Sequence, residues 1–507
     1  MARGLCGDHA VVAAPAAATL AASGKRLVFA GIVVGMALAS LDTTIVATAL
    51  PTMGSDLEAG DHISWIASVY LLTSTVMLPV YGKLGDLFGR QRTLRASIVI
   101  FLVGSLLAGV AQSLAQLIAF RALQGVGAGG LIVVSYAFIA DLVSPRDRGR
   151  YQGYVGAVQG AAVIAGPLAG GLLTDHLSWR WVFCINLPVG LFALVAMGRP
   201  VPVPTRSRVP RIDWTGAVLV GAAVTTVVLV LGRDDPGGVT ATGLLVMGGV
   251  VTVSGLLLFR VEQRAPEPIV PLRLFGDRTF LVSGGVNFLI GAVQFGALNF
   301  LPLLIQVMYG TSATNSGVLL IPLLLSLIGC SALAGQIASR TGRYRRLPVV
   351  GSSLVTASLV VVATLDATTP RAVVVVATVL LGAGIGLSMH ILTLATQNSV
   401  DVEDMGIATS LVYFCRAIGG LVGVALVGSM VGRAVDAAGT GIDPSGLSPE
   451  ELGRLDPGTL SRLSEHLAHG VATGALAYIG VMAVGVLAST RLREVPLRST
   501  PPPTLAT

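Results

Sequence analysis

A few titratable side chains lie within apolar stretches of this sequence, and Asp42, Arg121 and His390 are its best candidates for moving charge. Of the 26 acidic residues, only Asp42 falls well inside such a stretch, and Arg121 and His390 lie in two others. A buried lone carboxylate is costly when charged, so we expect Asp42 to exchange a proton for a cation, with Arg121 as its electrostatic counterweight. Histidine changes charge near neutral pH, which makes His390 a candidate for a second proton or substrate contact. Structural alternatives remain open: a fixed ion pair for Asp42 and Arg121, and helix packing for His390.

The chain as a whole is too apolar to be covered by water. Hydrophobic residues make up 53% of the 507 positions and charged residues 12%, and the mean hydropathy is +0.81. Stretches of about 20 apolar residues follow one another, and nothing alternates as transmembrane β-strands do. We therefore expect an all-α integral membrane protein with fourteen spans. The expected ranges are 27–50, 63–81, 94–112, 116–140, 152–173, 179–198, 213–232, 240–260, 280–301, 314–338, 347–365, 372–395, 406–432 and 471–490.

The positions of the basic residues orient these spans. Of the 33 lysines and arginines, 25 lie in the two tails and the connections that fourteen spans would place on the same side as the tails. Basic residues collect on the cytoplasmic side, so both termini are expected in the cytoplasm and the chain in the plasma membrane. The net charge of +7 is then a topology signal, and no nucleic-acid partner is needed to explain it.

A basic, glycine-rich segment, residues 82–92, separates the second and third spans. Its small and charged residues include Gly82, Asp86, Gly89 and Arg90. The glycines permit a tight turn, and the aspartate can lie against a helix N-terminus and pair with the arginine. The spacing recurs in degraded form at residues 335–345, where Ser339 replaces the aspartate. A plain basic loop would explain the arginines but not the repeated glycine spacing, so we expect a duplicated architecture with an asymmetric latch.

Several segments resemble motifs of the major facilitator superfamily. Residues 82–92 fit its loop between helices two and three, and residues 41–51 closely resemble the first-helix signature of its fourteen-helix drug:proton antiporter branch. Residues 117–130 resemble the fourth-helix motif and residues 156–171 the fifth-helix antiporter motif. Because the resemblance extends over nearly the whole chain, the sequence is identified as a member of this branch.

The resemblance implies two six-helix bundles around a central cavity, with two helices inserted between them. The expected division is a tail at 1–26, a first bundle at 27–198, a linker with two helices at 199–278, a second bundle at 279–490 with an outer loop at 433–470, and a tail at 491–507. A short amphipathic helix or two is expected in the outer loop.

The resemblance also implies a set of gating residues. Asp86 is expected to engage the opposite bundle when the transporter faces outward, and Asp141, which ends the fourth span, to join its charge network. On the fifth span, positions 156, 160, 167 and 171 fall on one stripe of small residues where the bundles are expected to meet and Pro167 to bend the helix. The expected gating residues are Gly82, Asp86, Gly89, Arg90, Asp141, Gly166 and Pro167.

Polar side chains on otherwise apolar spans are the candidates for lining the cavity. They are Tyr70, Gln124, Gln159, Asn287, Gln294, Asn299, Gln306, Gln397 and Arg416. Such a cavity has few fixed polar groups, which suits small lipophilic molecules and fits a sugar poorly, because many hydroxyls would go unpaired. No acid lies within residues 280–395 apart from Asp366 between two spans, which leaves the preference for multivalent cations open.

Other chemistries are not indicated. Residues 125–130 satisfy G-x-G-x-x-G but lie within an apolar helix, which argues against a dinucleotide, and the phosphate-binding G-x-x-x-x-G-K-[ST] pattern is absent from the sequence. His466 and His469 lack a third nearby ligand, so no metal is assigned. The four cysteines are far apart and suggest neither a disulfide framework nor a redox site. No cofactor is expected, and the chain is not expected to be an enzyme.

The sequence thus predicts a monomeric, proton-driven exporter of lipophilic drugs or antibiotics that works by alternating access. A carrier of a lipid or another natural product is the first alternative. A polytopic membrane enzyme or a sensor is an alternative of another class, and it would require clustered acid, base or metal-binding residues at a membrane face.

Overall fold

The computed structural model describes residues 22–198, 213–231, 241–265, 267–309, 313–366, 369–437 and 457–497. Its first helices are α1 (Ala22–Asp56), α2 (Trp65–Phe88), α3 (Arg90–Gly109), α4 (Leu114–Leu142), α5 (Pro145–His176), α6 (Trp181–Cys184) and α7 (Asn186–Ala196). Two further helices follow, α8 (Trp214–Leu231) and α9 (Ala241–Glu262). The remaining helices are α10 (Arg278–Tyr309), α11 (Ala313–Thr341), α12 (Arg346–Val362), α13 (Arg371–Ser399), α14 (Met405–Ala437) and α16 (Pro457–Thr490). Short 3-10 turns occur at Gly60–His62, Leu272–Gly276 and Val402–Asp404.

The predicted all-helical membrane fold is confirmed over these residues. Eleven helices are long and apolar enough to cross a membrane, and three shorter apolar helices, Trp181–Ala196, Trp214–Val230 and Arg346–Val362, complete the fourteen expected spans. The sixth span is divided, with α6 and α7 meeting at Ile185. Apolar side chains face outward along many helices, as with Leu168 and Leu172 of α5, and only lipid can solvate a surface of this kind.

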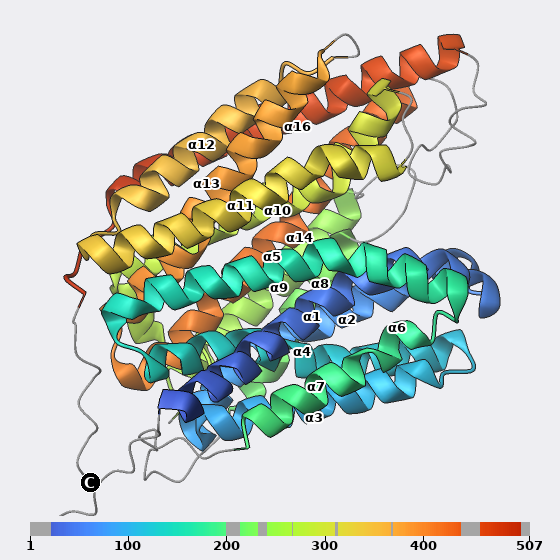
Figure 1. The fold of residues 1–507 in the computed structure, drawn as a ribbon. Coiled ribbons are helices and arrows are strands. Elements are labelled where there is room, and N and C mark those ends of the chain that lie inside the picture. The colour runs from blue at the N-terminus through green and yellow to red at the C-terminus, as the bar shows by residue number, and fades with distance from the viewer. Residues whose placement is uncertain are drawn as a thin grey trace, which may run out of the picture.

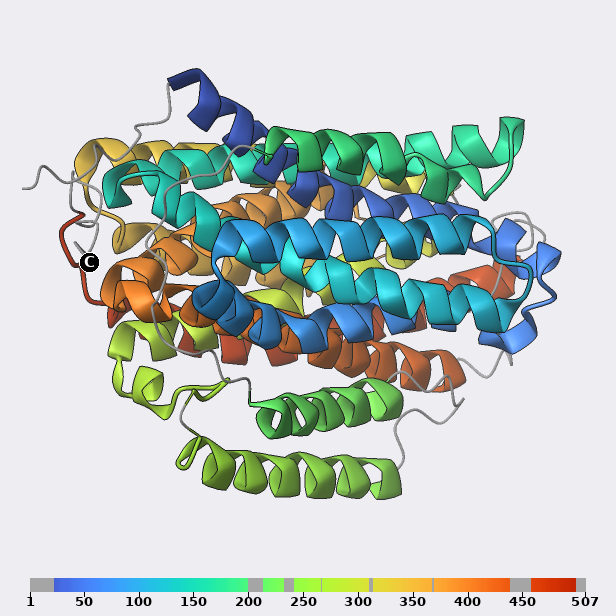
Figure 2. The same ribbon diagram turned by 90° about the horizontal axis from the view of Figure 1, so that it is seen from below.

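The helices form two groups that lie side by side (Figure 1). Helices α1 to α5 and α7 pack around one set of buried residues, and α10 to α14 with α16 pack around another. The α8 and α9 pair lies along one side of the molecule in Figure 2, and α8 contacts both α2 and α14. We call the group of α1 to α7 the first half and the group of α10 to α16 the second half.

The two halves are joined at the end that carries the turns near residues 89, 143, 342 and 400, which we call the latch end. There the N-terminal part of α5 packs against α11, with Gly149 against Gly335 and Gly153 against Ala332. Gly82 of α2 lies against Ser410 of α14 in the same way. A side chain at any of these glycines would collide with the opposite half, so backbone-to-backbone packing closes this end. Toward the other end the two groups of helices spread apart in Figure 1.

The structure corrects two expectations about these glycine motifs. Residues 82–88 are the last two turns of α2 and not a loop, and only Gly89, with φ of 89°, provides the break before α3. In the second copy, α11 likewise continues to Thr341 and the break falls at Gly342, with φ of 69°. Both angles lie in the region that favours glycine. The motif therefore supplies one turn residue and a helix face whose side chains are small enough for close contact with another helix.

The small-residue stripe on α5 contacts the second half along part of its length. Gly156 and Gly160 of the stripe face α11 and α13. Pro167 is exposed, and a Cβ at Gly171 would have no atom within 4 Å, so this part of the stripe is not closely packed. Gly166 and Gly170, on the neighbouring face of α5, lie against α1. The gating role expected of Gly166 and Pro167 stays a prediction.

The predicted outer loop is only partly described. Residues 448–451, expected to start a surface helix, lie outside the described residues. The stretch 460–467, expected to be a separate amphipathic helix, belongs to the continuous α16.

Candidate functional site

A fully buried cluster of polar side chains surrounds Asp42 inside the first half. Arg121 Nη1 of α4 donates to Asp42 Oδ2 at 2.6 Å. Gln124 Nε2 and Asn186 Nδ2 both donate to Asp42 Oδ1, at 2.7 and 2.9 Å. These four side chains are at most 1% exposed. The carboxylate therefore accepts three hydrogen bonds from α4 and α7 while its charge is neutralised by one guanidinium.

The surroundings of Arg121 hold this ion pair in one geometry. Its Nε donates to the carbonyl of Ile66 at 3.2 Å, its Nη1 also donates to Gln124 Oε1 at 2.7 Å, and the guanidinium lies 4.1 Å from the ring centre of Tyr70. Ser105 of α3 accepts from Asn186 at 2.9 Å and donates to a backbone carbonyl at 3.0 Å. The Asp42 cluster thus ties α1, α2, α3, α4 and α7 together.

Sequence reasoning placed some members of this cluster elsewhere and missed others. Tyr70 and Gln124 were expected to line the cavity, yet both are buried against Arg121. The reason is that the position of a polar residue in an apolar span indicates roughly how deep it lies in the membrane. It does not indicate which neighbouring helix the side chain faces. Asn186 and Ser105 were not predicted; a polar residue at the start of the sixth span was the available signal for Asn186, and Ser105 gave none.

The latch residues lie where α2, α3 and α4 meet the second half. Asp86 accepts from the backbone amides of Gly406 and Ile407, at 3.1 and 2.9 Å, which places its carboxylate at the N-terminus of α14. Arg90 bridges Asp86 at 3.1 Å and Asp141 at 2.7 Å. A carboxylate facing the free amides of a helix N-terminus is stabilised by the helix dipole, so Asp86 joins the two halves electrostatically.

The second copy of the motif makes the opposite kind of contact. Arg146, near the start of α5, donates to the backbone carbonyls of Ser339 and Arg340 at 3.0 and 3.2 Å. These carbonyls belong to the last turn of α11, where a cation is favoured. One side of the latch end therefore uses an acid at a helix N-terminus, and the other uses a base at a helix C-terminus.

Two further ion pairs lie beside the latch. Lys83 of α2 pairs with Glu267 at 2.6 Å, which connects the motif to the segment that follows α9. Arg273 pairs with Asp404 at 2.6 Å, and this hydrogen bond raises the pKa of Arg273 above its ordinary value. Both contacts bind the connection between the halves to the latch end.

A second polar cluster lies between the halves. Tyr136 of α4 donates to Gln159 at 3.0 Å and lies 3.4 Å from Nδ1 of His390 on α13. Its ring stacks on Tyr413 of α14 with centroids 4.7 Å apart. On α14, Arg416 donates from Nη2 to Gln294 Oε1 of α10 at 3.0 Å. We call these six residues the mid-site.

The mid-site and the Asp42 cluster are separate. Tyr136 follows Arg121 by 15 positions on the same helix, which corresponds to roughly 22 Å along its axis. His390 therefore does not join Asp42 and Arg121, with which it was grouped from sequence. The sequence indicates only roughly how deep a residue lies within its span, so it could not show that the two sites are this far apart.

The other expected cavity residues are dispersed. Gln397 bridges the halves near the latch end, where its amide contacts Gln152 and Thr409 at 3.1 Å each. Asn287 and Asn299 donate to carbonyls of their own helix α10, the first buried and the second exposed. Gln306 is half-buried further along α10.

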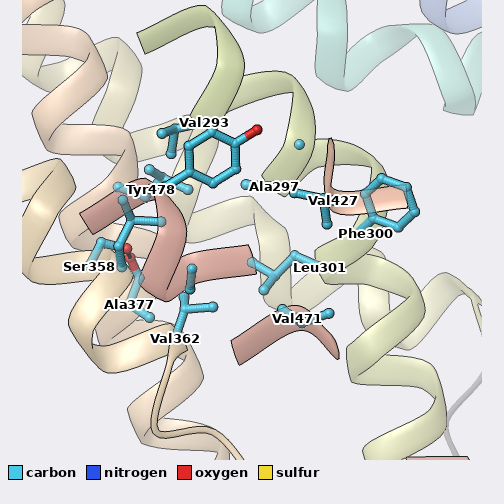
Figure 3. Close-up of a pocket in the computed structure, with 14 residues that line it drawn as sticks. Val293, Ala297, Phe300, Leu301, Ser358, Val362, Ala377, Val427, Val471 and Tyr478 are labelled. Atoms are coloured by element: carbon cyan, nitrogen blue, oxygen red, sulfur yellow. Dashed lines mark hydrogen bonds between the residues drawn. The ribbon is translucent and has the colours of Figure 1, made fainter. Parts of the chain in front are cut away.

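An apolar pocket lies within the second half (Figure 3). Val293 and Phe300 of α10, Val362 of α12 and Val471 of α16 contribute to its wall. Tyr478, also in the wall, donates its hydroxyl to the carbonyl of Gly423 at 3.1 Å. The pocket therefore offers apolar surface and little hydrogen bonding to a guest.

Metal ligation finds no support in the described part of the chain, where no three His, Cys, Asp or Glu residues are grouped to hold an ion. The helices, the latch between two halves and the buried charges together define a polytopic membrane protein whose halves meet at the latch end.

Comparisons with known proteins agree with this class. A family model described as Major Facilitator Superfamily matches residues 32–424. The chain is 38% identical to an uncharacterized MFS-type transporter, Rv1877, of Mycobacterium tuberculosis (strain ATCC 25618 / H37Rv), over 93% of this chain and 70% of that protein. It is 34% identical to the multidrug transporter protein MdtP of Bacillus subtilis (strain 168), over 81% of this chain and 76% of that protein.

A solved structure of the proton:xylose symporter XylE shares the fold, with a TM-score of 0.62 at 12% identity, covering 92% of this chain and 95% of that one. The protein belongs to the major facilitator superfamily. It is a membrane-spanning transporter of small substrates and not an enzyme, as expected from its motifs.

The Asp42 cluster generates a prediction about stability. Arg121→Gln should leave a buried carboxylate without its counter-charge and destabilise the protein by roughly 3 kcal/mol or more. Asp42→Asn combined with Arg121→Gln should cost less than Arg121→Gln alone, because no charge is then left unpaired. Thermal unfolding in detergent measures both, with the exposed Arg433→Gln of α14 as control. If the double variant is as unstable as the sum of the single variants, the two charges do not interact as described.

The latch generates a prediction about closure. In protein whose four cysteines are replaced by alanine, Arg146→Cys and Arg340→Cys should be joined by a short bismaleimide, because both positions are exposed and the side chain of Arg146 reaches the backbone of Arg340 across the latch. Asp86→Asn should slow this cross-linking about five-fold, since a charge at a helix end contributes about 1 kcal/mol. The matched control is Asp175→Asn, an exposed acid of the first half near the other end of α5. An unchanged rate in Asp86→Asn would mean that the carboxylate does not hold the halves together.

Proposed function

We propose that this transporter is a proton-coupled antiporter that exports lipophilic compounds by alternating access. The observation that carries the proposal is the position of Asp42, an acid in the middle of α1 that is fully buried and paired with Arg121. Burying such an acid costs desolvation free energy that stability alone does not require. In membrane proteins a buried acid commonly marks a proton pathway. Protonation would neutralise Asp42 and release Arg121, Gln124 and Asn186 from it.

The contacts between the halves support a mechanism in which one half, residues 27–198, rocks against the other, residues 279–490. The join at the latch end consists of helix-terminus contacts and glycine packing, which can separate without unfolding either half. Proton uptake at Asp42 would bias this equilibrium through α1. That helix contacts α5 at Thr44 and Gly166, close to Asp42.

Orientation and location also belong to the proposal. The concentration of lysine and arginine at the latch end favours its placement in the cytoplasm, together with both termini, in the plasma membrane. The closed latch end would then represent an outward-facing arrangement. A proton entering through about 100 mV supplies about 2.3 kcal/mol, enough for roughly a fifty-fold gradient of a neutral solute. We propose that a monomer suffices, because a single chain supplies both halves and the latch between them.

The proposed substrates are lipophilic molecules. The apolar pocket and the few polar groups between the halves favour lipophilic molecules, and MdtP, a relative at 34% identity, is named a multidrug transporter. Self-resistance and general efflux are both compatible with these features.

The proposal predicts that Asp42→Asn abolishes uphill transport. Purified protein in liposomes, given an imposed pH gradient and a panel of dyes and antibiotics, should accumulate at least one compound against its gradient. Asp42→Asn should lose this accumulation because its side chain cannot exchange a proton. Asp56→Asn, which removes the half-exposed acid at the end of the same helix, should pump as the parent does. Pumping by Asp42→Asn at the parental rate, or uphill movement of no compound by the parent, contradicts the proposal.

A further inference from the structure

We infer that the mid-site binds an anionic oxygen group of an aromatic substrate, with Arg416 as its counter-charge. This inference rests on the proposed export function and names the substrate class of that function. It concerns the six residues Tyr136, Gln159, Gln294, His390, Tyr413 and Arg416.

The first argument is the unneutralised charge of Arg416. No ion pair joins Arg416 to a carboxylate among the described residues, and its Nη2 donates only to the neutral amide of Gln294. The acids of α2 and α4, which pack against α14, are remote: Asp86 of α2 lies at Gly406, ten positions or roughly 15 Å along α14 from Arg416, and α4 carries Asp141 at its end. Arg121 is fully buried and neutralised by Asp42, whereas Arg416 is half-buried and forms no ion pair among the described residues. A cation held in a low-dielectric interior without a counter-ion attracts an anion strongly and repels another cation.

The second argument is the set of polar atoms that the protein leaves without partners. Nε of Arg416 and Nε2 of His390 are buried and have no hydrogen-bond partner among the described residues, and the buried hydroxyl of Tyr413, which lies near Tyr136 and Thr393, forms no hydrogen bond of good geometry. Tyr413 is 7% exposed and His390 2% exposed, so bulk water does not satisfy them. Nε of Arg416 and the hydroxyl of Tyr413 carry a hydrogen to donate, whereas Nε2 of His390 is an acceptor when Nδ1 donates to Tyr136. Buried donors without acceptors are costly, which is the state expected of a site that awaits an acceptor.

The third argument is the aromatic surface beside these donors. The rings of Tyr136 and Tyr413 stack at an interplanar angle of 25°, and the ring of His390 lies 5.9 Å from Tyr136. These rings come from α4, α14 and α13, hence from both halves. A flat aromatic ring can pack on them while its oxygen group meets Arg416. Because both halves contribute, a ligand here would be sensitive to their relative position.

The binding test uses three probes with the same ring system and different charge: 9-anthracenecarboxylate, 9-anthracenecarboxamide and 9-anthracenylmethylammonium. Their fluorescence is titrated against the full-length protein in nanodiscs, with empty nanodiscs to subtract partition into lipid. The carboxylate should bind about tenfold more tightly than the ammonium, because charge-assisted hydrogen bonds to arginine are the strong ones. Equal or tighter binding of the ammonium, or no binding of the carboxylate, would overturn the inference.

Variants test which residue produces the preference for the carboxylate probe. Arg416→Gln should weaken carboxylate binding about tenfold and leave carboxamide binding within about twofold, whereas Arg416→Lys should keep part of the preference. Tyr413→Phe, which removes one hydroxyl and keeps the ring, should weaken the carboxylate several-fold and guards against a folding defect in the arginine variants. Arg433→Gln on the same helix should change none of the three affinities. If Arg416→Gln weakens all three probes equally, Arg416 acts in packing and the inference fails.

The test is independent of proton coupling. Affinities are measured without a pH gradient, so a preference for the carboxylate would stand even if Asp42→Asn pumped normally. Conversely, loss of pumping in Asp42→Asn with no charge preference among the probes would support the proposed function and refute the mid-site assignment.

Discussion

The ion pair between Asp42 and Arg121 is the interaction on which the first half depends. Both groups are removed from water and lipid, and their mutual attraction alone would not offset the cost of their desolvation. Gln124 and Asn186 donate further hydrogen bonds to the carboxylate. Arg121 donates to the carbonyl of Ile66, and the ring of Tyr70 covers the guanidinium. Five helices are therefore organised around a charge. If that charge changes, the arrangement that it stabilises must change as well.

A continuous path of packed helices leads from this pair to the latch end. Thr44 and Thr48 of α1, two and six positions after Asp42, lie against Gly166 and Gly170 of α5. The same α5 then contacts α11 through Gly160, Gly153 and Gly149. A rigid helix with one partner on each side is a suitable lever, because its glycine surfaces allow only a few close-packed positions. In our account, proton uptake at Asp42 is transmitted by this lever.

The sequence was sufficient for the architecture but not for the geometry of the sites. All fourteen spans could be found because hydropathy determines where a chain can cross a bilayer. The segment at residues 82–88 was taken for a turn because glycine often breaks soluble helices, whereas here Gly82 permits close contact with Ser410 and remains helical. Asn186 was not predicted because contact between the first and sixth spans depends on tertiary packing. His390 was grouped with Asp42 because depth within a span gives no information about which partners a side chain meets.

The central claim is that proton uptake at Asp42 is coupled to substrate binding through the equilibrium between the two halves. The most direct measurement is proton release when a transported compound is added to purified protein in weakly buffered detergent solution containing a pH indicator. Our account predicts that the parent releases up to about one proton per bound molecule, and that Asp42→Asn binds the compound without releasing one. Equal release by both proteins, or none from the parent at any starting pH, would contradict it.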